Sequence, residues 1–169
     1  GVTALAVLQA MQPNYALAQQ VAPDDPAIRA GYVTYPSPEG HGEVRAYRVA
    51  PAAPGPWPGV DVVHENRGLN PYIEDVARRL ACAGFLALAP DGLTSLGGYP
   101  GNDDKGRAMQ ATVDPVKRMN DFLAAVEHLQ RDPEGTGHTG IVGFCYGGGV
   151  AAAAAVANPA LAASVSFYG

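Results

Sequence analysis

The most informative stretch of this sequence is Gly143-Phe144-Cys145-Tyr146-Gly147. It follows a short run typical of a β-strand, residues 139–142, and precedes an alanine-rich run, residues 150–157, that favours a helix. A sharp strand-to-helix turn needs small residues two positions before and after its tip, because strand and helix approach closely there. The turn also places the cysteine sulfur at the N-terminal end of the helix, where unpaired N–H groups and the helix dipole favour a thiolate.

This pattern is the nucleophile elbow of the α/β-hydrolases, with cysteine at the position that usually holds serine. In that fold the acid and the histidine follow the nucleophile along the chain. Only 24 residues follow Cys145, and none of them is His, Asp or Glu. The chain has four histidines, all of which precede it: His41, His64, His128 and His138. The sequence therefore predicts a nucleophile whose usual base lies outside residues 1–169.

Composition and charge narrow the class of protein. With 169 residues and a hydrophobic content of 47%, the chain is expected to form at most one domain with a sizeable core. A net charge of −5 argues against nucleic acid or an anionic membrane surface as a partner. No apolar run reaches transmembrane length. The two cysteines provide no disulfide framework. Cys82 is expected to lie in a helix and to be buried in the protein core.

Residues 1–25 are predicted to be a signal-sequence remnant or an N-terminal extension. Ala16-Leu17-Ala18 matches the small-x-small pattern of a cleavage site behind an apolar stretch. This favours a periplasmic or secreted bacterial protein, with the cytoplasm as the alternative. An ordinary N-terminal helix, with Leu5 and Leu8 packed on the body, would explain the same residues.

Residues 26–169 are predicted to be the N-terminal portion of a single α/β-hydrolase domain, because strands and helices alternate along them. We expect a mostly parallel sheet that begins with an antiparallel pair and lacks its C-terminal strands. The expected strands are 32–35, 43–49, 59–64, 85–89, 139–142 and 163–168. Helices are expected to begin at Asn70-Pro71, at Asp114-Pro115 and after the elbow. Residues 90–106 are expected to form a long polar loop.

Periodicity predicts which helix faces are buried. In the helix after Asn70 the expected face is Ile73, Val76, Ala77 and Leu80. In the helix after Asp114 it is Val116, Met119, Leu123, Val126 and Gln130.

A second candidate segment, residues 62–68 (VVHENRG), ends the first buried strand. In open α/β sheets, functional sites lie beyond the carboxyl ends of the strands. α/β-Hydrolases supply one oxyanion N–H from this loop and the other from the residue after the nucleophile. The sequence therefore predicts an oxyanion hole made of the backbone N–H groups of Asn66 and Tyr146.

Four segments together resemble the dienelactone hydrolase family: 64–70 (HENRGLN), 75–81 (DVARRLA), 87–91 (ALAPD) and 143–149 (GFCYGGG). The resemblance runs from about Ala30 to Gly169. It implies hydrolysis of a small-molecule ester or lactone through a thiol-acyl intermediate, without a metal or organic cofactor. It also implies that Glu65 contacts the resting thiol and takes part in its activation, and that the family's Asp and His lie beyond Gly169.

In one loop the sequence departs from the family pattern. The family has an arginine, in the loop after the Pro-Asp pair, that helps to hold the carboxylate of the dienelactone. The aligned stretch here, residues 92–95 (GLTS), contains no arginine. This argues against dienelactone itself as the substrate.

Each candidate residue has a structural alternative. Glu65 is either a functional acid or a solvated carboxylate, and its place at the end of an apolar strand favours function. His64 is expected to pack structurally on the opposite side of its strand. Arg67 either binds an acidic substrate or pairs with a nearby carboxylate, and the sequence leaves both open. Tyr146 is expected to line the substrate pocket.

Asp103 and Asp104 resemble a metal-ligating pair, but no histidine or further acidic cluster supports a metal site. A solvated loop is therefore the favoured interpretation of this pair.

Two hypotheses follow. In the first, the chain belongs to a cysteine hydrolase in which Cys145 attacks a carbonyl and a histidine beyond Gly169 relays protons. In the second, it is a non-catalytic remnant or one chain of a two-chain assembly, whose second chain carries the missing C-terminal segment.

Overall fold

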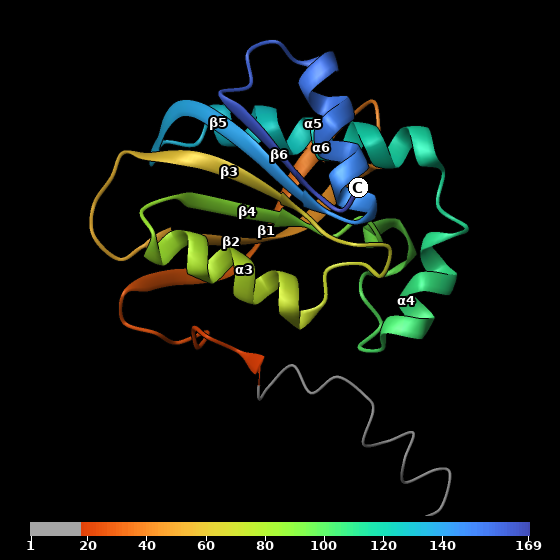
Figure 1. Cartoon of the computed structure of the whole chain (residues 1–169), viewed down its shortest axis with the longest axis horizontal. Coiled ribbons are helices and arrows are strands. Elements are labelled where there is room, and N and C mark those ends of the chain that lie inside the picture. The colour runs from red at the N-terminus through yellow and green to blue at the C-terminus, as the bar shows by residue number, and fades with distance from the viewer. Residues whose placement is uncertain (1–17) are drawn as a thin grey trace, which may run out of the picture.

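The computed structural model describes residues 18–169, which form one mixed β-sheet with helices on both faces (Figure 1). The sheet has six strands in the order β1-β2-β4-β3-β5-β6. The strands are β1 (Ile28–Ser37), β2 (Gly42–Pro51), β3 (Trp57–Val63), β4 (Leu86–Pro90), β5 (Gly135–Phe144) and β6 (Ala163–Phe167). The helices are α3 (Pro71–Cys82), the short 3₁₀ helix η1 (Thr94–Leu96), α4 (Asp103–Gln110), α5 (Pro115–Gln130) and α6 (Tyr146–Ala157).

The sheet is antiparallel at its N-terminal side and parallel elsewhere. β2 pairs antiparallel with β1 and with β4. β3 pairs parallel with β4 and β5, and β5 pairs parallel with β6. These pairings confirm the predicted α/β fold with an antiparallel pair at its start. The hairpin strands are longer than predicted, because β1 pairs with β2 along all of its residues and not only where apolar residues alternate.

Helix α3 begins where its capping residues predict. The Asn70 side chain accepts a hydrogen bond from the backbone N–H of Ile73, and Pro71 occupies the first helical position. Ile73, Val76 and Ala77 are buried and Leu80 is partly buried, which confirms the predicted face. This face packs on one side of the sheet, against residues such as Val62 of β3.

Helices α5 and α6 cover the opposite side of the sheet from α3 (Figure 1). The predicted buried face of α5 is partly wrong, because Val116 is 68% exposed. Asp114 caps α5 by accepting hydrogen bonds from the backbone N–H groups of Val116 and Lys117, and residues 115–117 of this first turn are exposed. The residues that α5 buries most deeply against the sheet are Phe122, Ala125, Val126 and Leu129.

The segment 90–106, predicted to be a loop, contains η1 and the first half of α4. The Asn102 side chain caps α4 by accepting a hydrogen bond from the backbone N–H of Lys105 at 3.0 Å. The prediction failed here because the glycines and polar residues of this segment hide the helical pattern.

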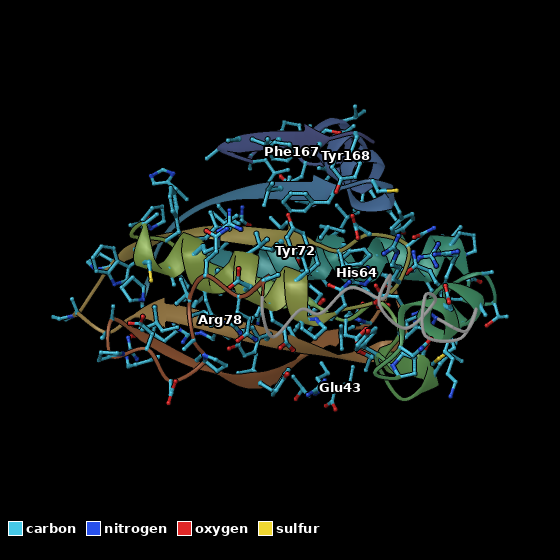
Figure 2. All side chains as sticks on the ribbon, turned by 60° about the horizontal axis from the view of Figure 1, so that its bottom comes forward. Glu43, His64, Tyr72, Arg78, Phe167 and Tyr168 are labelled. Atoms are coloured by element: carbon cyan, nitrogen blue, oxygen red, sulfur yellow. The ribbon has the colours of Figure 1, made fainter. Side chains whose placement is uncertain are left out.

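β6 is the outermost strand of the sheet, and β5 lies inside the sheet between β3 and β6. Val165 and Phe167 of β6 are 44% and 47% exposed, as the sequence predicts for an uncovered strand. On the α3 side, an apolar groove of about 810 Å³ lies between α3 and β6. Its lining includes Tyr72, Val76, Phe144, Val165, Phe167 and Tyr168. Figure 2 shows Tyr72 on α3 and, on the β6 side of the groove, Phe167 and Tyr168.

Four further expectations concern the two ends of the chain, membrane spans and Cys82. Most of the proposed signal-sequence remnant, residues 1–17, lies outside the described residues, and the C-terminal strands of the predicted domain remain a prediction. No helix within residues 18–169 combines the length and apolar composition needed to cross a membrane. Cys82 was expected in the core but is exposed, because it is the last residue of α3 and lies beyond its buried face.

Candidate active site

Three neighbouring strands end side by side at the candidate site. In β3 and β5, Val63 lies opposite Gly143, and in β5 and β6, Phe144 lies opposite Phe167. The chain therefore brings Glu65, Cys145 and Tyr168 to the same edge of the sheet, just beyond the strand ends. This is the edge at which open α/β sheets place their functional sites.

Cys145 occupies the tip of the turn between β5 and α6, with φ 53° and ψ −117°. A non-glycine residue with positive φ is strained, and the close packing around Cys145 holds it there. A Cβ atom on Gly143 would lie 1.7 Å from the carbonyl oxygen of Gly147. A Cβ atom on Gly147 would lie 2.3 Å from the carbonyl oxygen of Val63. The elbow can therefore close only with glycine at both positions.

Backbone hydrogen bonds fix the turn on both sides of Cys145. Its N–H donates to the carbonyl oxygen of Phe167 at 2.9 Å, which ties the turn to the end of β6. Its carbonyl oxygen accepts from the N–H of Gly148 at 2.9 Å, which starts α6. Tyr146 is the first residue of α6. Its backbone N–H therefore has no carbonyl acceptor within the helix. Cys145 itself is half-buried.

Glu65 is bound by Tyr168. The Tyr168 hydroxyl donates to Oε1 of Glu65 at 2.8 Å. Burial, the hydrogen bond to Glu65 and the electrostatic effect of the Glu65 carboxylate raise the pKa of Tyr168 to about 12. Tyr168 is therefore a neutral hydrogen-bond donor throughout the physiological pH range.

His64 has the structural place that the sequence predicts. Its ring is fully buried and meets the Phe122 ring edge-on. Nε2 accepts a hydrogen bond from the backbone N–H of Gly92 at 2.9 Å, so Nδ1 carries the proton and donates to the carbonyl oxygen of Glu65 at 2.5 Å. Burial lowers the pKa of His64 and keeps the ring neutral. Both ring nitrogens are occupied, so His64 is not available as a base for Cys145.

Arg67 pairs with a carboxylate, which is one of the two alternatives that the sequence leaves open. Its Nη1 donates to Oδ2 of Asp103 at 3.2 Å. Oδ1 of Asp103 accepts from the hydroxyl of Tyr99 at 2.8 Å and from Nδ2 of Asn70 at 3.4 Å. The expectation of a solvated loop at Asp103 is therefore wrong, because α4 turns this side chain inward. Within residues 18–169, no group of three or more His, Cys, Asp or Glu side chains could hold a metal ion.

Sequence analysis missed Arg118, a buried residue of α5 next to the elbow. Its Nε donates to the Tyr146 hydroxyl at 2.8 Å, and its guanidinium lies over the Tyr146 ring at 4.5 Å. Tyr146 thus turns its side chain toward α5, and burial raises its pKa. The only signal for Arg118 in the sequence is its position between apolar residues of the predicted helix, which indicates that it could be buried.

The comparisons with known proteins agree with this geometry. The model of the dienelactone hydrolase family matches residues 44–169. The "Putative hydrolase fragment YghX" of Escherichia coli is 69% identical over 115 residues, covering 68% of this chain and 98% of that protein. The "Putative carboxymethylenebutenolidase" of Methylorubrum extorquens is 36% identical over 164 residues, covering 95% of this chain and 55% of that protein.

A solved structure, a "Putative Dienelactone Hydrolase" from Klebsiella pneumoniae, superposes with a TM-score of 0.69 at 33% identity. The match covers 85% of this chain and 60% of that chain. The chain thus spans little more than half the length of the Methylorubrum and Klebsiella proteins. On the family match, the sequence identities and the shared fold, this chain belongs to the dienelactone hydrolase family.

Proposed function

We propose that this chain contributes the nucleophile and the oxyanion hole of a hydrolase that cleaves ester or lactone bonds of small molecules. The observation that carries the proposal is the turn at Cys145, where a non-glycine residue is held at φ 53°. Such strain costs on the order of 1–3 kcal/mol and persists only where the surrounding structure enforces it. The family match supports hydrolysis as the reaction.

The reaction starts when the Cys145 thiolate attacks the carbonyl carbon of the ester. A C–S bond forms, and the carbonyl oxygen takes the negative charge next to the N–H groups of Asn66 and Tyr146. Each such donor is typically worth about 3 kcal/mol of transition-state stabilisation. The C–O bond then breaks, and the alcohol leaves with the proton that the base had taken from the thiol. Water attacks the thioester carbon, returns a proton through the same base, and releases the carboxylic acid and the thiolate.

The base is assigned to a histidine of the domain region that follows the nucleophile in this fold. No histidine in residues 18–169 suits this task. The His64 ring is fully bonded, Nδ1 of His41 lies 2.6 Å from Oδ2 of Asp121, and the His128 ring stacks on Tyr35. His138 lies near the start of β5, at the opposite end of the strand from Cys145.

The partner proposed for this chain is a second polypeptide that carries the remaining part of the family domain. Two features support it. The edge strand β6 offers backbone groups for a further parallel strand, and the groove between α3 and β6 offers an apolar surface for a helix. The alternative hypothesis is a non-catalytic remnant. Its support is that no base lies beside Cys145 in the described residues.

The proposal is tested by mixing this chain with the part of the Methylorubrum protein that follows its match to this chain. Turnover of p-nitrophenyl acetate by the mixture, lost in Cys145→Ala and kept in Cys82→Ala, is the expected result. Cys145→Ala that keeps more than a few per cent of the activity would remove Cys145 from the nucleophile position. A mixture that forms a complex without turnover would support the non-catalytic alternative.

We also propose that the protein acts in the periplasm or outside the cell, on the basis of Ala16-Leu17-Ala18. The backbone N–H groups of Gln20 and Val21 both donate to Oδ1 of Asp75 at 3.0 Å, so the chain is bound to helix α3 at Gln20 and Val21. Cell fractionation and intact mass test the proposal. A periplasmic protein that starts at Gln19 is expected, whereas a cytoplasmic protein that retains residues 1–18 would contradict it.

A further inference from the structure

We propose that helix α4 positions the candidate oxyanion hole, through Gly106 at its centre and arginine contacts at its two ends. This inference rests on the proposed function, because it assigns a task to α4 in the same hydrolysis. α4 does not cover a face of the sheet but lies beyond the carboxyl ends of the strands (Figure 1).

The centre of α4 lies directly against the backbone of Arg67. A Cβ atom on Gly106 would lie 2.1 Å from the carbonyl oxygen of Arg67 and 3.0 Å from its carbonyl carbon. Glycine inside a helix is less favourable than alanine by about 1 kcal/mol. Gly106 therefore lowers the stability of the helix but lets α4 approach the backbone of Arg67 closely. α4 therefore presses on the residue that follows Asn66.

The N-terminal end of α4 is bound to the same loop. Asp103, the first residue of α4, accepts from Nη1 of Arg67 at 3.2 Å. Its other carboxylate oxygen accepts from Tyr99 and from Asn70, the residue that caps α3. Asp103 thus ties α4 to the loop between β3 and α3, which carries the Asn66 N–H.

The C-terminal end of α4 is bound to the elbow through Arg118. Nη1 of Arg118 donates to the carbonyl oxygen of Gln110, the last residue of α4, at 2.8 Å. Nε of the same guanidinium donates to the Tyr146 hydroxyl at 2.8 Å. Arg118 is buried, so these contacts are shielded from water.

α4 therefore connects the two residues whose backbone N–H groups form the candidate oxyanion hole. One end adjoins Asn66 through Arg67, and the other adjoins Tyr146 through Arg118. A displaced α4 should change the spacing of the two N–H groups and leave the sulfur untouched. The expected defect is weaker stabilisation of an oxyanion without a change in thiol reactivity.

Two reactions of the full chain separate these effects. Acylation of Cys145 by p-nitrophenyl acetate passes through an oxyanion, whereas alkylation by iodoacetamide does not. In a Cys82→Ala background, Gly106→Ala and Asp103→Asn should each slow acylation by about tenfold, a fraction of the effect of losing a whole oxyanion donor. Alkylation should stay within about twofold of the parent, since the elbow and its helix are unchanged.

The matched control is Asp104→Asn, on the exposed side of the same helix turn, where the side chain pairs with Arg107. It should leave both reactions unchanged. Normal acylation in both Gly106→Ala and Asp103→Asn would overturn the proposed positioning by α4. Acylation and alkylation that fall equally would overturn it too, because this result indicates a general structural defect. A parent chain that is alkylated but never acylated would instead overturn the proposed function itself.

Discussion

The Tyr168 hydroxyl donates a hydrogen bond to Oε1 of Glu65 at 2.8 Å, across the end of strand β5. Cys145 lies at that strand end, between the two residues. Tyr168 is the donor in this bond, because its pKa is raised to about 12 and its hydroxyl stays protonated. The bond therefore holds Glu65 and Tyr168 together at the edge of the sheet that carries Cys145.

If Glu65 acts on the thiol as the family resemblance implies, Glu65→Gln should alter the pH dependence of Cys145 alkylation, because an acid at this strand edge can exchange a proton with the sulfur or repel it. The measurement is the iodoacetamide rate as a function of pH in a Cys82→Ala background. Rates that overlay those of the parent across the whole pH range would remove Glu65 from the environment of the thiol.

Tyr168 reports on the same substitution independently. Glu65 is one of the causes that raise the pKa of Tyr168, so in Glu65→Gln its phenol should ionise at lower pH than in the parent. The ultraviolet difference spectrum of tyrosine ionisation measures this shift, with Tyr168→Phe to identify the signal. An unchanged titration would mean that the two side chains do not interact in solution.

Gly143→Ala should destabilise the fold by about 3 kcal/mol or more, because its methyl group would overlap the carbonyl oxygen of Gly147. Gly149→Ala is the matched control in the same elbow sequence, since a methyl group there meets nothing within 4 Å. Urea unfolding measures both free energies. A Gly143→Ala variant as stable as Gly149→Ala would contradict the close packing of the elbow.

Asp61 on the central strand β3 is fully buried, and neither carboxylate oxygen has a hydrogen-bond partner among the described residues. Burial raises its pKa well above the usual value and favours the protonated form in the folded chain. Below the pKa of an unfolded aspartate, Asp61 is protonated in both states and the fold keeps its full stability. As the pH rises through the folded-state pKa, the free energy of unfolding falls, because the unfolded chain can ionise Asp61 and the folded chain resists it.

Asp61→Val should therefore raise the free energy of unfolding at pH 7 by about 2 kcal/mol, with a smaller gain at pH 4. Urea unfolding at both pH values measures the difference. The exposed Asp104→Asn is the control and should change neither value appreciably. A gain that does not grow with pH would contradict a buried, unpartnered Asp61.

The sequence predicted the parts of the fold that local chemistry dictates. The glycines around Cys145 predicted the elbow, and Asn70 with Pro71 predicted the start of α3, because both patterns satisfy backbone needs within a few residues. Helix α4 was missed because its glycine and polar residues hide the helical pattern, and the reason for Gly106, its close approach to the carbonyl oxygen of Arg67, lies in a distant segment. Arg118 was missed for a similar reason, because its partners Gln110 and Tyr146 belong to other helices.

Two residues were placed wrongly because periodicity does not fix the phase of a helix near its ends. Val116 matches the apolar spacing of α5 but lies in a first turn that projects into solvent. Cys82 continues the apolar pattern of α3 but lies past the last buried position. At the site, the sequence predicted which strand ends meet, and it could not predict the bond between Tyr168 and Glu65.

Phe167→Asp should prevent this chain from binding the remaining part of the family domain, because the substitution puts a charge into the apolar groove. Size-exclusion chromatography with light scattering measures the complex with the Methylorubrum segment described above. Val156→Asp is the control, on an 85% exposed side chain outside the groove. Equal binding by Phe167→Asp and the parent would show that the groove is not the contact surface.

The chemistry assigned to Cys145 is tested most directly by the intact mass and peptide map of the chain after brief exposure to p-nitrophenyl acetate. The predicted result is a single acetyl group on Cys145, absent in Cys145→Ala and slow to hydrolyse, because no base lies beside the thioester in the described residues. The Tyr168→Phe chain should acquire the same adduct, since Tyr168 contacts Glu65 and is not the nucleophile. An acetyl group on Cys82 in preference to Cys145, or no adduct at all, would contradict Cys145 as the nucleophile.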